Sequence, residues 1–221
     1  MTRNPSPPAP RPSPDSTIFI LDDDPSARKG LALLVRSAGW HCEAFSSARE
    51  FLARPAFSGT GCLVLDVCMP GMTGLELRDL MTAKGALLPI VFLTGHGDVP
   101  MGVDAMKQGA VDFLQKPVND EALLEAISRA VERHAAALGR QREVERIQAG
   151  LQQLTARERQ VLEYVIGGYL NKQIAAELRI AERTVKIFRG NLMHKMGVNS
   201  VAELVRQCEI AGIAPRPPSS A

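Results

Sequence analysis

The stretch Cys62-Leu63-Val64-Leu65-Asp66-Val67-Cys68-Met69-Pro70-Gly71 decides the fold of this chain. An apolar run of strand length ends on the carboxylate of Asp66 and passes directly into a loop that contains Pro70 and Gly71. Such a run is typical of a strand that is buried on both faces of a sheet. In open α/β folds, functional groups lie at the carboxyl ends of the strands. Asp66 is therefore predicted to lie at the functional edge of a parallel sheet.

Three further polar signals follow apolar runs of the same kind. They are the acidic triplet Asp22-Asp23-Asp24 after residues 18–21, Thr94 after residues 89–93, and Lys116 after residues 111–115. Because the carboxyl ends of parallel strands meet at one edge, these carboxylates, the hydroxyl and the amine are expected to converge. Such a group of side chains indicates an aspartate that accepts a phosphoryl group.

The first half of the chain alternates strand-like runs with helical patterns. Strands are predicted near residues 17–21, 41–45, 62–66, 90–94 and 111–115, and helices near residues 25–38, 47–53, 74–83 and 98–108, with a last helix from about Asn119. Five such repeats predict an α/β fold, a five-stranded parallel doubly wound sheet of the flavodoxin-like kind, covered on both faces.

Length and charge indicate two domains with different partners. The 221 residues are enough for two modest cores, and no apolar stretch is long enough to span a bilayer. Residues 17–134 carry 11 Lys and Arg against 15 Asp and Glu, whereas residues 135–221 carry 13 against 8. An acidic module joined to a basic one favours a sensing or catalytic domain followed by a domain that binds a polyanion. Ordinary variation in surface charge is the alternative interpretation.

The two ends and the cysteines bear on location. Residues 1–16 are rich in proline and serine and lack the apolar core of a signal peptide, so they are expected to be disordered, as are residues 214–221. The four cysteines lack metal-ligand spacing, which favours reduced thiols in a cytoplasmic protein.

The last helix of the first half is expected to continue into a connector. Leu124, Ile127, Val131, His134 and Leu138 recur at helical spacing, and Val144, Ile147, Leu151 and Leu154 recur in a shifted register. The shift contains Gly139, so a long amphipathic connector with a break near Gly139 is predicted. A loop is the alternative.

The remaining segment is predicted to be all-helical. Thr155 and Glu158 form a capping box that opens a helix to about Ile166, and Gly167-Gly168 ends it. A short helix near residues 171–178, a turn at residues 179–181 and a longer helix to Met196 follow, with another helix at about 201–210. Two helices across such a short turn indicate helix-turn-helix DNA binding.

The longer helix has two distinct faces. Val185, Phe188, Leu192 and Met196 share one face and should pack inward. The opposite face carries Arg183, Lys186, Ile187, Gly190 and His194, with Asn191 at its margin. Basic, apolar and small side chains on one exposed face suit the major groove of DNA. A basic face that only contacts solvent is the alternative.

The residues at the sheet edge can be given chemical roles. Asp66 is a weak nucleophile, and its attack on a phosphoryl donor brings negative oxygens against a carboxylate. Asp22 and Asp23 could hold a Mg²⁺ beside Asp66, since Mg²⁺ prefers carboxylate oxygen and retained water. Lys116 can contact the phosphoryl oxygens as a point charge, and Thr94 can donate a hydrogen bond to them. Any one of these residues alone would more readily be an ordinary solvated loop residue, whereas all four at consecutive strand ends favour the phosphoryl-accepting site.

The first half resembles the receiver domain of bacterial two-component response regulators. The matching pieces are Leu21-Asp22-Asp23-Asp24, Leu65-Asp66 with residues 69–74, Thr94-Gly95-His96-Gly97-Asp98, and Phe113-Leu114-Gln115-Lys116-Pro117. The resemblance implies phosphorylation of Asp66 by a histidine kinase, and Mg²⁺ bound by Asp22, Asp23, Asp66 and the backbone carbonyl of Cys68. It also implies phosphoryl contacts from Thr94 and Lys116, a switch aromatic at Phe113 and a cis Lys116-Pro117 bond.

The second half resembles the LuxR-type helix-turn-helix. The matching pieces are residues 154–162, Asn171-Lys172-Gln173-Ile174-Ala175 and Arg183-Thr184-Val185-Lys186. Together the halves resemble the NarL/FixJ class of regulators, nearest to the FixJ-like subgroup. This implies a four-helix DNA-binding domain whose candidate DNA contacts are Lys172, Arg183, Thr184, Lys186, Ile187, Arg189, Gly190, Asn191 and His194. Phe188 departs from the family, which usually has His there.

The resemblance implies a phosphoryl acceptor that dimerises on phosphorylation, not an enzyme beyond slow self-dephosphorylation. Its partners would be a histidine kinase, double-stranded DNA, a second copy and, as a further candidate, RNA polymerase. The expected domains are a receiver over residues 17–134, a connector over 135–150 and a DNA-binding domain over 151–213.

Three other function classes are alternatives to a phosphorylated transcription regulator. A phosphatase of the haloacid-dehalogenase type needs a second Asp where Cys68 stands, and a dinucleotide-binding enzyme needs a glycine where Pro100 stands. A regulator that ignores phosphorylation is the third alternative.

Overall fold

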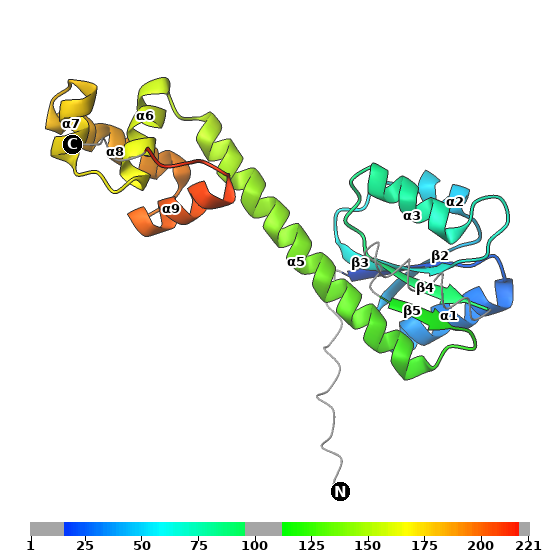
Figure 1. Cartoon of the computed structure of the whole chain (residues 1–221). Helices are drawn as coiled ribbons and strands as arrows, with labels where there is room; N and C mark the ends of the chain where they lie inside the picture. Colours follow the sequence, from blue (N-terminus) through cyan, green and yellow to red (C-terminus); the bar gives the residue numbers. More distant parts are fainter. Residues whose placement is uncertain (1–15, 96–111, 217–221) are drawn as a thin grey trace, which may run out of the picture. The chain divides into compact units, whose positions relative to one another are not determined.

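The computed structural model describes residues 16–95 and 112–216 (Figure 1). These residues form two compact units that divide between Leu138 and Gly139, inside the expected connector. Within the described ranges, no helix combines the length and the apolar character that crossing a membrane requires. The predicted helix at residues 98–108 and the first fifteen residues of the chain lie outside the description.

The first unit is built on five parallel strands. Their bounds are β1 Ser16–Leu21, β2 His41–Phe45, β3 Thr60–Asp66, β4 Ile90–Thr94 and β5 Asp112–Gln115. The sheet order is β2-β1-β3-β4-β5 and every neighbouring pair is parallel, which confirms the predicted doubly wound sheet. Two ends differ from the prediction, because β1 already starts at Ser16, in the expected tail, and β3 starts at Thr60. Ser16 is drawn into the sheet by a 2.6 Å hydrogen bond between its hydroxyl and that of Thr60.

Helices cover both faces of this sheet, as Figure 1 shows. Their bounds are α1 Pro25–Ser37, α2 Ala48–Ala53, α3 Gly74–Ala83 and α5 Asp120–Gln152. Alternate residues of β1 point to opposite faces: Ile18 and Ile20 pack with α1 and α5, whereas Phe19 and Leu21 pack with α2 and α3. The three inner strands, β1, β3 and β4, are buried on both faces and are nearly continuous apolar runs, which is why they could be located in the sequence.

The predicted break near Gly139 is wrong, since α5 runs without interruption from Asp120 to Gln152. One glycine inside a helix costs only about 1 kcal/mol relative to alanine. The shift in apolar register has another cause. Ile127 and Val131 belong to the core of the first unit, whereas Ile147 belongs to the core of the second. The register shift therefore marks a change of core along one continuous helix.

The second unit contains four further helices, as predicted. They are α6 Ala156–Ile166, α7 Asn171–Leu178, α8 Glu182–Met196 and α9 Val201–Ile210. Thr155 and Glu158 form the predicted capping box at the start of α6. Arg179 ends α7 in the left-handed conformation with φ of 52°, and this allows α8 to begin only three residues later. The sharp turn between α7 and α8 is the geometry of a helix-turn-helix.

The four helices are held together by an internal ion pair as well as by the core. The carboxylate of Glu158, which is 3% exposed, accepts hydrogen bonds from the backbone and the hydroxyl of Thr155 and from Lys195 Nζ at 2.7 Å. The hydrogen bond from Lys195, together with those from Thr155, lowers the pKa of Glu158 against the opposing effect of burial. This bond joins the start of α6 to the end of α8, the helix that carries the expected DNA contacts.

Candidate functional site

Three carboxylates meet at the carboxyl edge of the sheet in the first unit. Asp22 directly follows β1 and Asp66 ends β3, and these strands are neighbours in which Leu21 pairs with Leu65. Asp22, Asp23 and Asp66 each place a carboxylate oxygen within 4.8 Å of the others. Asp22 and Asp66 are buried, whereas Asp23 is exposed. The sheet register thus brings together acids that are far apart in the sequence.

Lys116 closes this acidic cluster. Its Nζ atom lies 2.7 Å from Asp22 Oδ2 and 2.7 Å from Asp66 Oδ2. Burial alone would lower the pKa of Lys116, but the hydrogen bonds and charges of both carboxylates outweigh it and raise this pKa. The peptide bond from Lys116 to Pro117 is cis, as the family resemblance implied. An ammonium group shared by two buried carboxylates partly offsets their charge and holds them in place.

Thr94 and Phe113 lie on the two strands beyond Asp66. Thr94 ends β4 in a buried position, and its carbonyl accepts a 2.7 Å hydrogen bond from the backbone N–H of Lys116. Phe113 is half-buried on β5, with its ring centroid 6.1 Å from that of Phe92. The structure therefore places Thr94 at the same edge as the acids, and Phe113 on the strand next to it. The roles of hydroxyl donor and switch aromatic stay predictions.

The loop after Asp66 is shaped by close backbone contacts. The backbone N–H of Cys68 donates to Asp66 Oδ1 at 3.1 Å, and the Cys68 side chain is exposed. The coordination of a metal by the Cys68 carbonyl stays a prediction. At Gly74, an added Cβ would lie 2.5 Å from the carbonyl oxygen of Asp66. Gly74 therefore lets α3 begin directly beneath Asp66.

Sequence reasoning assigned no role to Gly74 or to Arg28. Arg28 Nη1 donates to the carbonyl oxygen of Asp22 at 2.7 Å and so supports the acidic loop from α1. The Thr73–Glu76 capping box was a readable sign that a helix starts at Gly74. The third acid of the triplet, Asp24, serves a different purpose from its neighbours. Its Oδ1 accepts from the backbone N–H of Ser26 at 2.7 Å, so Asp24 is the N-cap of α1.

The donor set at this edge fits a divalent cation. Three carboxylate oxygens within one small space are ligands that Mg²⁺ prefers, and the exposed position of Asp23 leaves one side open to water. Lys116 already donates to two of these carboxylates, so a bound cation and the ammonium group would share them. The acids, Lys116 and Thr94 were all predicted to lie at this edge of the sheet, and the structure brings them together there.

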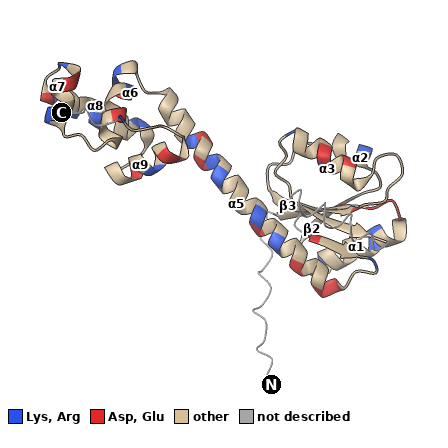
Figure 2. Ribbon diagram, in the orientation of Figure 1, with Lys and Arg blue, Asp and Glu red and all other residues tan. Residues whose placement is uncertain are grey.

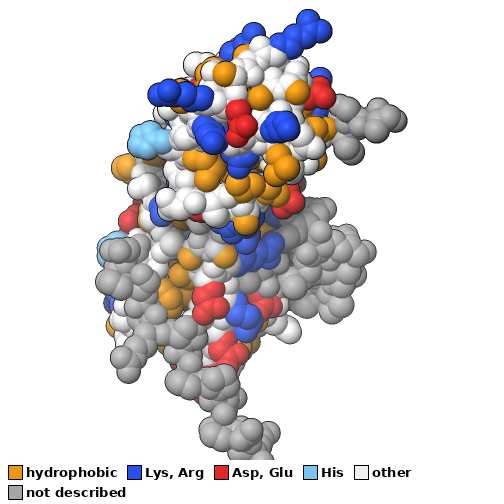
Figure 3. All heavy atoms as spheres, turned by 90° about the vertical axis from the view of Figure 1, so that its left-hand side faces the viewer, with side chains coloured by type: hydrophobic (Ala, Val, Ile, Leu, Met, Phe, Trp, Pro, Cys, Tyr) orange, Lys and Arg blue, Asp and Glu red, His pale blue; other side chains and the backbone are white. Residues whose placement is uncertain are grey.

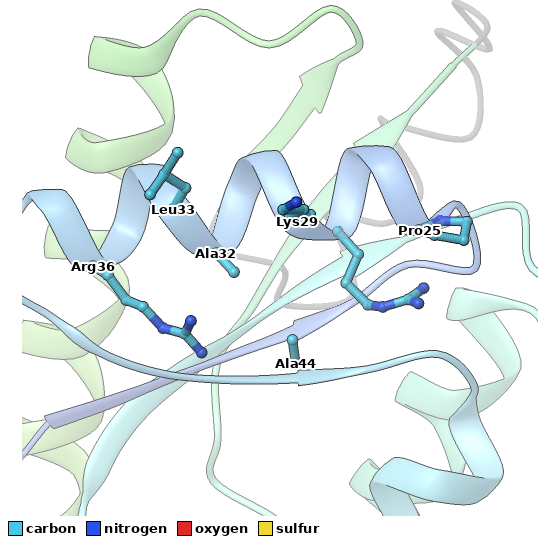
Figure 4. A pocket seen from close by; sticks show the side chains of 7 residues that line it. Pro25, Lys29, Ala32, Leu33, Arg36 and Ala44 are labelled. Atoms are coloured by element: carbon cyan, nitrogen blue, oxygen red, sulfur yellow. The ribbon is translucent and has the colours of Figure 1, made fainter.

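A separate surface pocket of about 370 Å³ lies between α1 and β2 (Figure 4). Its labelled lining residues are Pro25, Lys29, Ala32, Leu33, Arg36 and Ala44. The guanidinium of Arg36 is engaged with the carbonyl of Cys42 at 3.2 Å. None of the three clustered acids lines this pocket, so it is not the site of the acidic chemistry.

The second candidate site is the outer face of α8. Val185, Leu192 and Met196 are buried in the core of the second unit and Phe188 packs against it, as predicted. Arg183, Lys186, Ile187, Gly190, Asn191 and His194 are all exposed, as is Lys172 at the start of α7. Figure 2 shows basic residues recurring along α8, and Figure 3 shows Lys and Arg side chains gathered on one exposed face of the second unit.

Two of the expected DNA contacts are less accessible than the others. Thr184 is half-buried, and Arg189 is half-buried with its Nη1 donating to Asn171 Oδ1 at 3.0 Å. Arg189 is therefore occupied in joining α8 to the first residue of α7. Lys186 is different, because its side chain is 66% exposed and its nearest acid, Glu182, lies 3.6 Å away on the same helix.

Family comparisons agree with both sites. The family described as the response regulator receiver domain matches residues 18–128, and the luxR family of bacterial regulatory proteins matches residues 152–208. The chain is 46% identical to Nodulation protein W of Bradyrhizobium diazoefficiens over 91% of this chain and 89% of that protein. It is 47% identical to Response regulator protein TodT of Pseudomonas putida, over 88% and 86% of the two chains.

Solved structures give the same result. The response regulator StyR matches with a TM-score of 0.82 and 47% identity, over 88% of this chain and 98% of that one. Full-length FixJ from B. japonicum matches with a TM-score of 0.54 and 45% identity, over 89% and 97% of the two chains. These matches favour the predicted class over the alternative of a regulator that ignores phosphorylation. The chain belongs to the two-component response regulators of the NarL/FixJ type, in which a receiver domain is joined to a LuxR-type DNA-binding domain.

Proposed function

We propose that this response regulator accepts a phosphoryl group on Asp66 from a histidine kinase, and that the phosphorylated form dimerises and regulates transcription through α8. The observation that carries the proposal is the shared position of Lys116 between Asp22 and Asp66, within a cluster of three carboxylates. Burial of carboxylates costs free energy unless they are paired, and here one lysine pairs with both buried acids. This arrangement places a nucleophilic oxygen, a cation and metal ligands within reach of one incoming group.

The chemistry follows from the charges on the chain. A carboxylate oxygen of Asp66 forms a bond to phosphorus, and the bond from phosphorus to the donor nitrogen of phosphohistidine breaks. Lys116 can transfer its contact from the Asp66 carboxylate to the new phosphoryl oxygens as the negative charge moves onto them. Thr94 supplies a hydroxyl at the neighbouring strand end. Mg²⁺ held by Asp22, Asp23 and Asp66 would neutralise part of the phosphoryl charge.

DNA binding is assigned to the exposed side chains of α8 and to Lys172. Exposed Lys and Arg side chains contact phosphates and guanine, and the 55% exposed Ile187 can meet a thymine methyl group. One helix-turn-helix reads only a half-site, so strong binding should need two copies about one helical turn apart. This is the reason for proposing a dimer, whose formation is promoted by phosphorylation of Asp66.

The remaining partners follow from the same scheme. RNA polymerase is a candidate partner of the DNA-bound form, and the cytoplasm is the expected place of action. The protein acts as a phosphoryl acceptor, with at most slow self-dephosphorylation, and not as an enzyme on other substrates.

The test combines the oligomeric state with DNA binding. Sedimentation of the full chain with Mg²⁺ and beryllofluoride, a mimic of the phosphoryl group, should show dimers that bind a duplex selected from a randomised pool. Asp66→Asn is the control, because it removes the charged acceptor oxygen and should leave the chain monomeric under the same conditions. A chain that stays monomeric with beryllofluoride, yet fully occupies the selected duplex, would rule this mechanism out.

A further inference from the structure

The segment that follows α9 lies against the carboxyl end of α6. This Arg216 segment (residues 214–216) was expected to be disordered, but its last residue makes several contacts. The backbone N–H of Arg216 donates to the carbonyl of Glu163 at 3.0 Å, and its Nη1 lies 3.6 Å from the Glu163 carboxylate. The guanidinium also lies over the ring of Tyr164, 5.4 Å from the centroid. The structure therefore places Arg216 against α6, whereas the expected disorder of residues 214–221 stays a prediction.

Gly167 shows how closely the segment approaches α6. An added Cβ at Gly167 would lie 2.9 Å from the carbonyl oxygen of Arg216, closer than side chains are found in proteins. The backbone of Gly167 has φ of −78° and ψ of 0°, which every residue type can adopt. Glycine is thus needed at this helix end for the approach of the Arg216 segment and not for the turn itself.

A series of contacts leads from Arg216 to the helix-turn-helix. The ring of Tyr164 meets that of Tyr169 edge to face at 5.2 Å, and the backbone N–H of Tyr169 donates to the carbonyl of Tyr164 at 3.1 Å. Tyr169 stands two residues before Asn171, the first residue of α7. Asn171 in turn accepts the hydrogen bond from Arg189 on α8. The corner between α6 and α7 is therefore the shared support of the segment and of the recognition helix.

We propose that Arg216 is a positioning residue for DNA binding, which holds the corner at residues 167–171 and thereby sets the orientation of α8 through the Asn171–Arg189 hydrogen bond. The inference rests on the proposed binding of DNA by α8. Arg216 is itself exposed, and exposed ion pairs contribute little to global stability. Its loss should therefore change the geometry of the corner more than it changes folding.

The experiment compares chains that end at different residues. A chain that ends at Arg216 lacks only residues 217–221 and is the control, whereas a chain that ends at Ile213 lacks the whole segment. Arg216→Ala and Gly167→Ala test the same contact from its two sides. Each chain is titrated with two DNA probes, the duplex selected by the unaltered chain from a randomised pool and a duplex of unrelated sequence. Titrations are made at a temperature where circular dichroism shows every chain to be folded.

The expected result is a loss of sequence preference. Removal of the segment, Arg216→Ala and Gly167→Ala should each weaken binding to the selected duplex by about three- to tenfold, the scale of the cation–π contact with Tyr164 that all three changes disturb. Binding to the unrelated duplex and the dependence on salt should not change, because phosphate contacts are kept. The chain with both Arg216→Ala and Gly167→Ala should bind the selected duplex no more weakly than the worse of the two single variants, since both substitutions disturb the same contact. The control chain should match the unaltered chain.

Three results would overturn the proposal. The first is unchanged preference in the chain that ends at Ile213. The second is equal weakening on both duplexes with a smaller salt dependence, which would make Arg216 a direct phosphate contact. The third is unchanged amide hydrogen exchange at residues 167–171 of the free protein after removal of the segment, where faster exchange is expected. Unchanged exchange would show, without any use of DNA, that the segment does not hold this corner. If the unaltered chain selected no duplex, the proposed function would fail, and hydrogen exchange would still decide whether the segment holds the corner.

Discussion

The acidic edge of the first unit and the outer face of α8 in the second are built in opposite ways. At the acidic edge, Asp22 and Asp66 are 1% and 7% exposed and both lie 2.7 Å from one lysine. On α8, Lys186 is 66% exposed and its nearest acid lies 3.6 Å away. The first site is held by its neighbours before any ligand arrives, whereas the second leaves most of its side chains exposed to solvent.

This difference follows from the ligand of each site. Transfer of a phosphoryl group needs a nucleophile, cations and donors at fixed distances, so the protein must hold these groups in place through burial and pairing. DNA supplies its own rigid surface and a high density of charge, so long exposed side chains can adjust to it. Single substitutions at the acidic edge should therefore abolish phosphorylation or metal binding almost completely. Single substitutions on α8 should only weaken DNA binding by degrees.

The largest expected effect is at Asp66. Asp66→Asn should abolish acid-labile phosphorylation by acetyl phosphate, because the amide lacks the nucleophilic oxygen charge, while the fold is kept. Phosphate-affinity gel electrophoresis gives the measurement. Asp24→Asn is the matched control, since it also removes one charge but keeps a good N-cap for α1. Labelling of Asp66→Asn at the normal level would show that another residue accepts the phosphoryl group.

The next effect concerns the metal ligands. Asp23→Ala should weaken Mg²⁺ binding by at least about tenfold, because it removes the exposed member of the cluster of three carboxylates. Isothermal titration calorimetry of the full chain measures the affinity directly, again with Asp24→Asn as the control. An affinity that does not change would exclude Asp23 from the metal site. The metal ligands at this edge would then be limited to the buried acids Asp22 and Asp66.

On α8 the effects should be graded. Lys186→Ala should cost about 1–3 kcal/mol in binding to a selected duplex, with relaxed preference at one base pair if the lysine reads a base edge. A phosphate contact would instead weaken binding to all sequences and reduce the salt dependence by about one ion. Fluorescence anisotropy over a range of salt concentrations separates the two cases, with the exposed Lys84→Ala of the first unit as the control. Unchanged binding would mean that the reading face lies elsewhere.

A smaller effect is expected at the Glu158–Lys195 ion pair, which joins α6 to α8. Glu158→Gln keeps the capping geometry but removes the charge that pairs with Lys195, so the second unit should lose about 1–2 kcal/mol of unfolding free energy. Both tyrosines, Tyr164 and Tyr169, lie in the second unit, so tyrosine fluorescence reports its unfolding in denaturant. The exposed Glu145→Gln serves as the control. A loss no larger than that of the control would show that the ion pair does not stabilise this unit.

The smallest effect is a dependence of stability on pH. Burial lowers the pKa of His134, against the opposing effect of the hydrogen bond between its ring Nδ1 and the carbonyl oxygen of Gly61. Above about pH 6.5 the folded and unfolded states both hold neutral histidine. Below this pH the unfolded state binds the proton first, so the first unit should lose stability as the pH falls toward the folded pKa.

His134→Asn keeps a hydrogen-bond acceptor but cannot be protonated, so the loss between pH 7.5 and pH 5.5 should be smaller in this variant. Trp40, the only tryptophan, is buried in the first unit, and its fluorescence reports the unfolding of that unit. Equal losses in both chains would mean that other groups cause the pH dependence.

Much of the acidic edge could be predicted because its residues stand at or just after the carboxyl ends of apolar strands. The order of the strands and the parallel pairing then bring these residues to one edge. The short distances from Lys116 to both carboxylates could not be predicted, since they depend on the path of a lysine side chain across two neighbouring strand ends. Gly74 was missed for the same reason, because the close approach of α3 to Asp66 is a contact between separate elements.

On the second unit, the periodicity of α8 was enough to separate its buried face from its exposed face. This periodicity could not show that Arg189 donates a hydrogen bond to Asn171. A basic residue at the border between the two faces of a helix gives the same sequence pattern whether its side chain is free or paired. The predicted break at Gly139 failed because the sequence shows a shift of apolar register without showing which core each register enters.

The sequence by itself determined the five strands, the helices that alternate with them within the described residues, the helix-turn-helix and the family, since local hydrophobic periodicity and short motifs depend only on neighbouring residues. The tertiary structure decided which charges pair, that α5 is one helix, and that Arg216 returns to the end of α6. The charge pairs of Lys116 and the return of Arg216 join residues far apart in the chain, and the continuity of α5 depends on which core each apolar register enters. Their stability comes from burial and close packing that no local pattern contains.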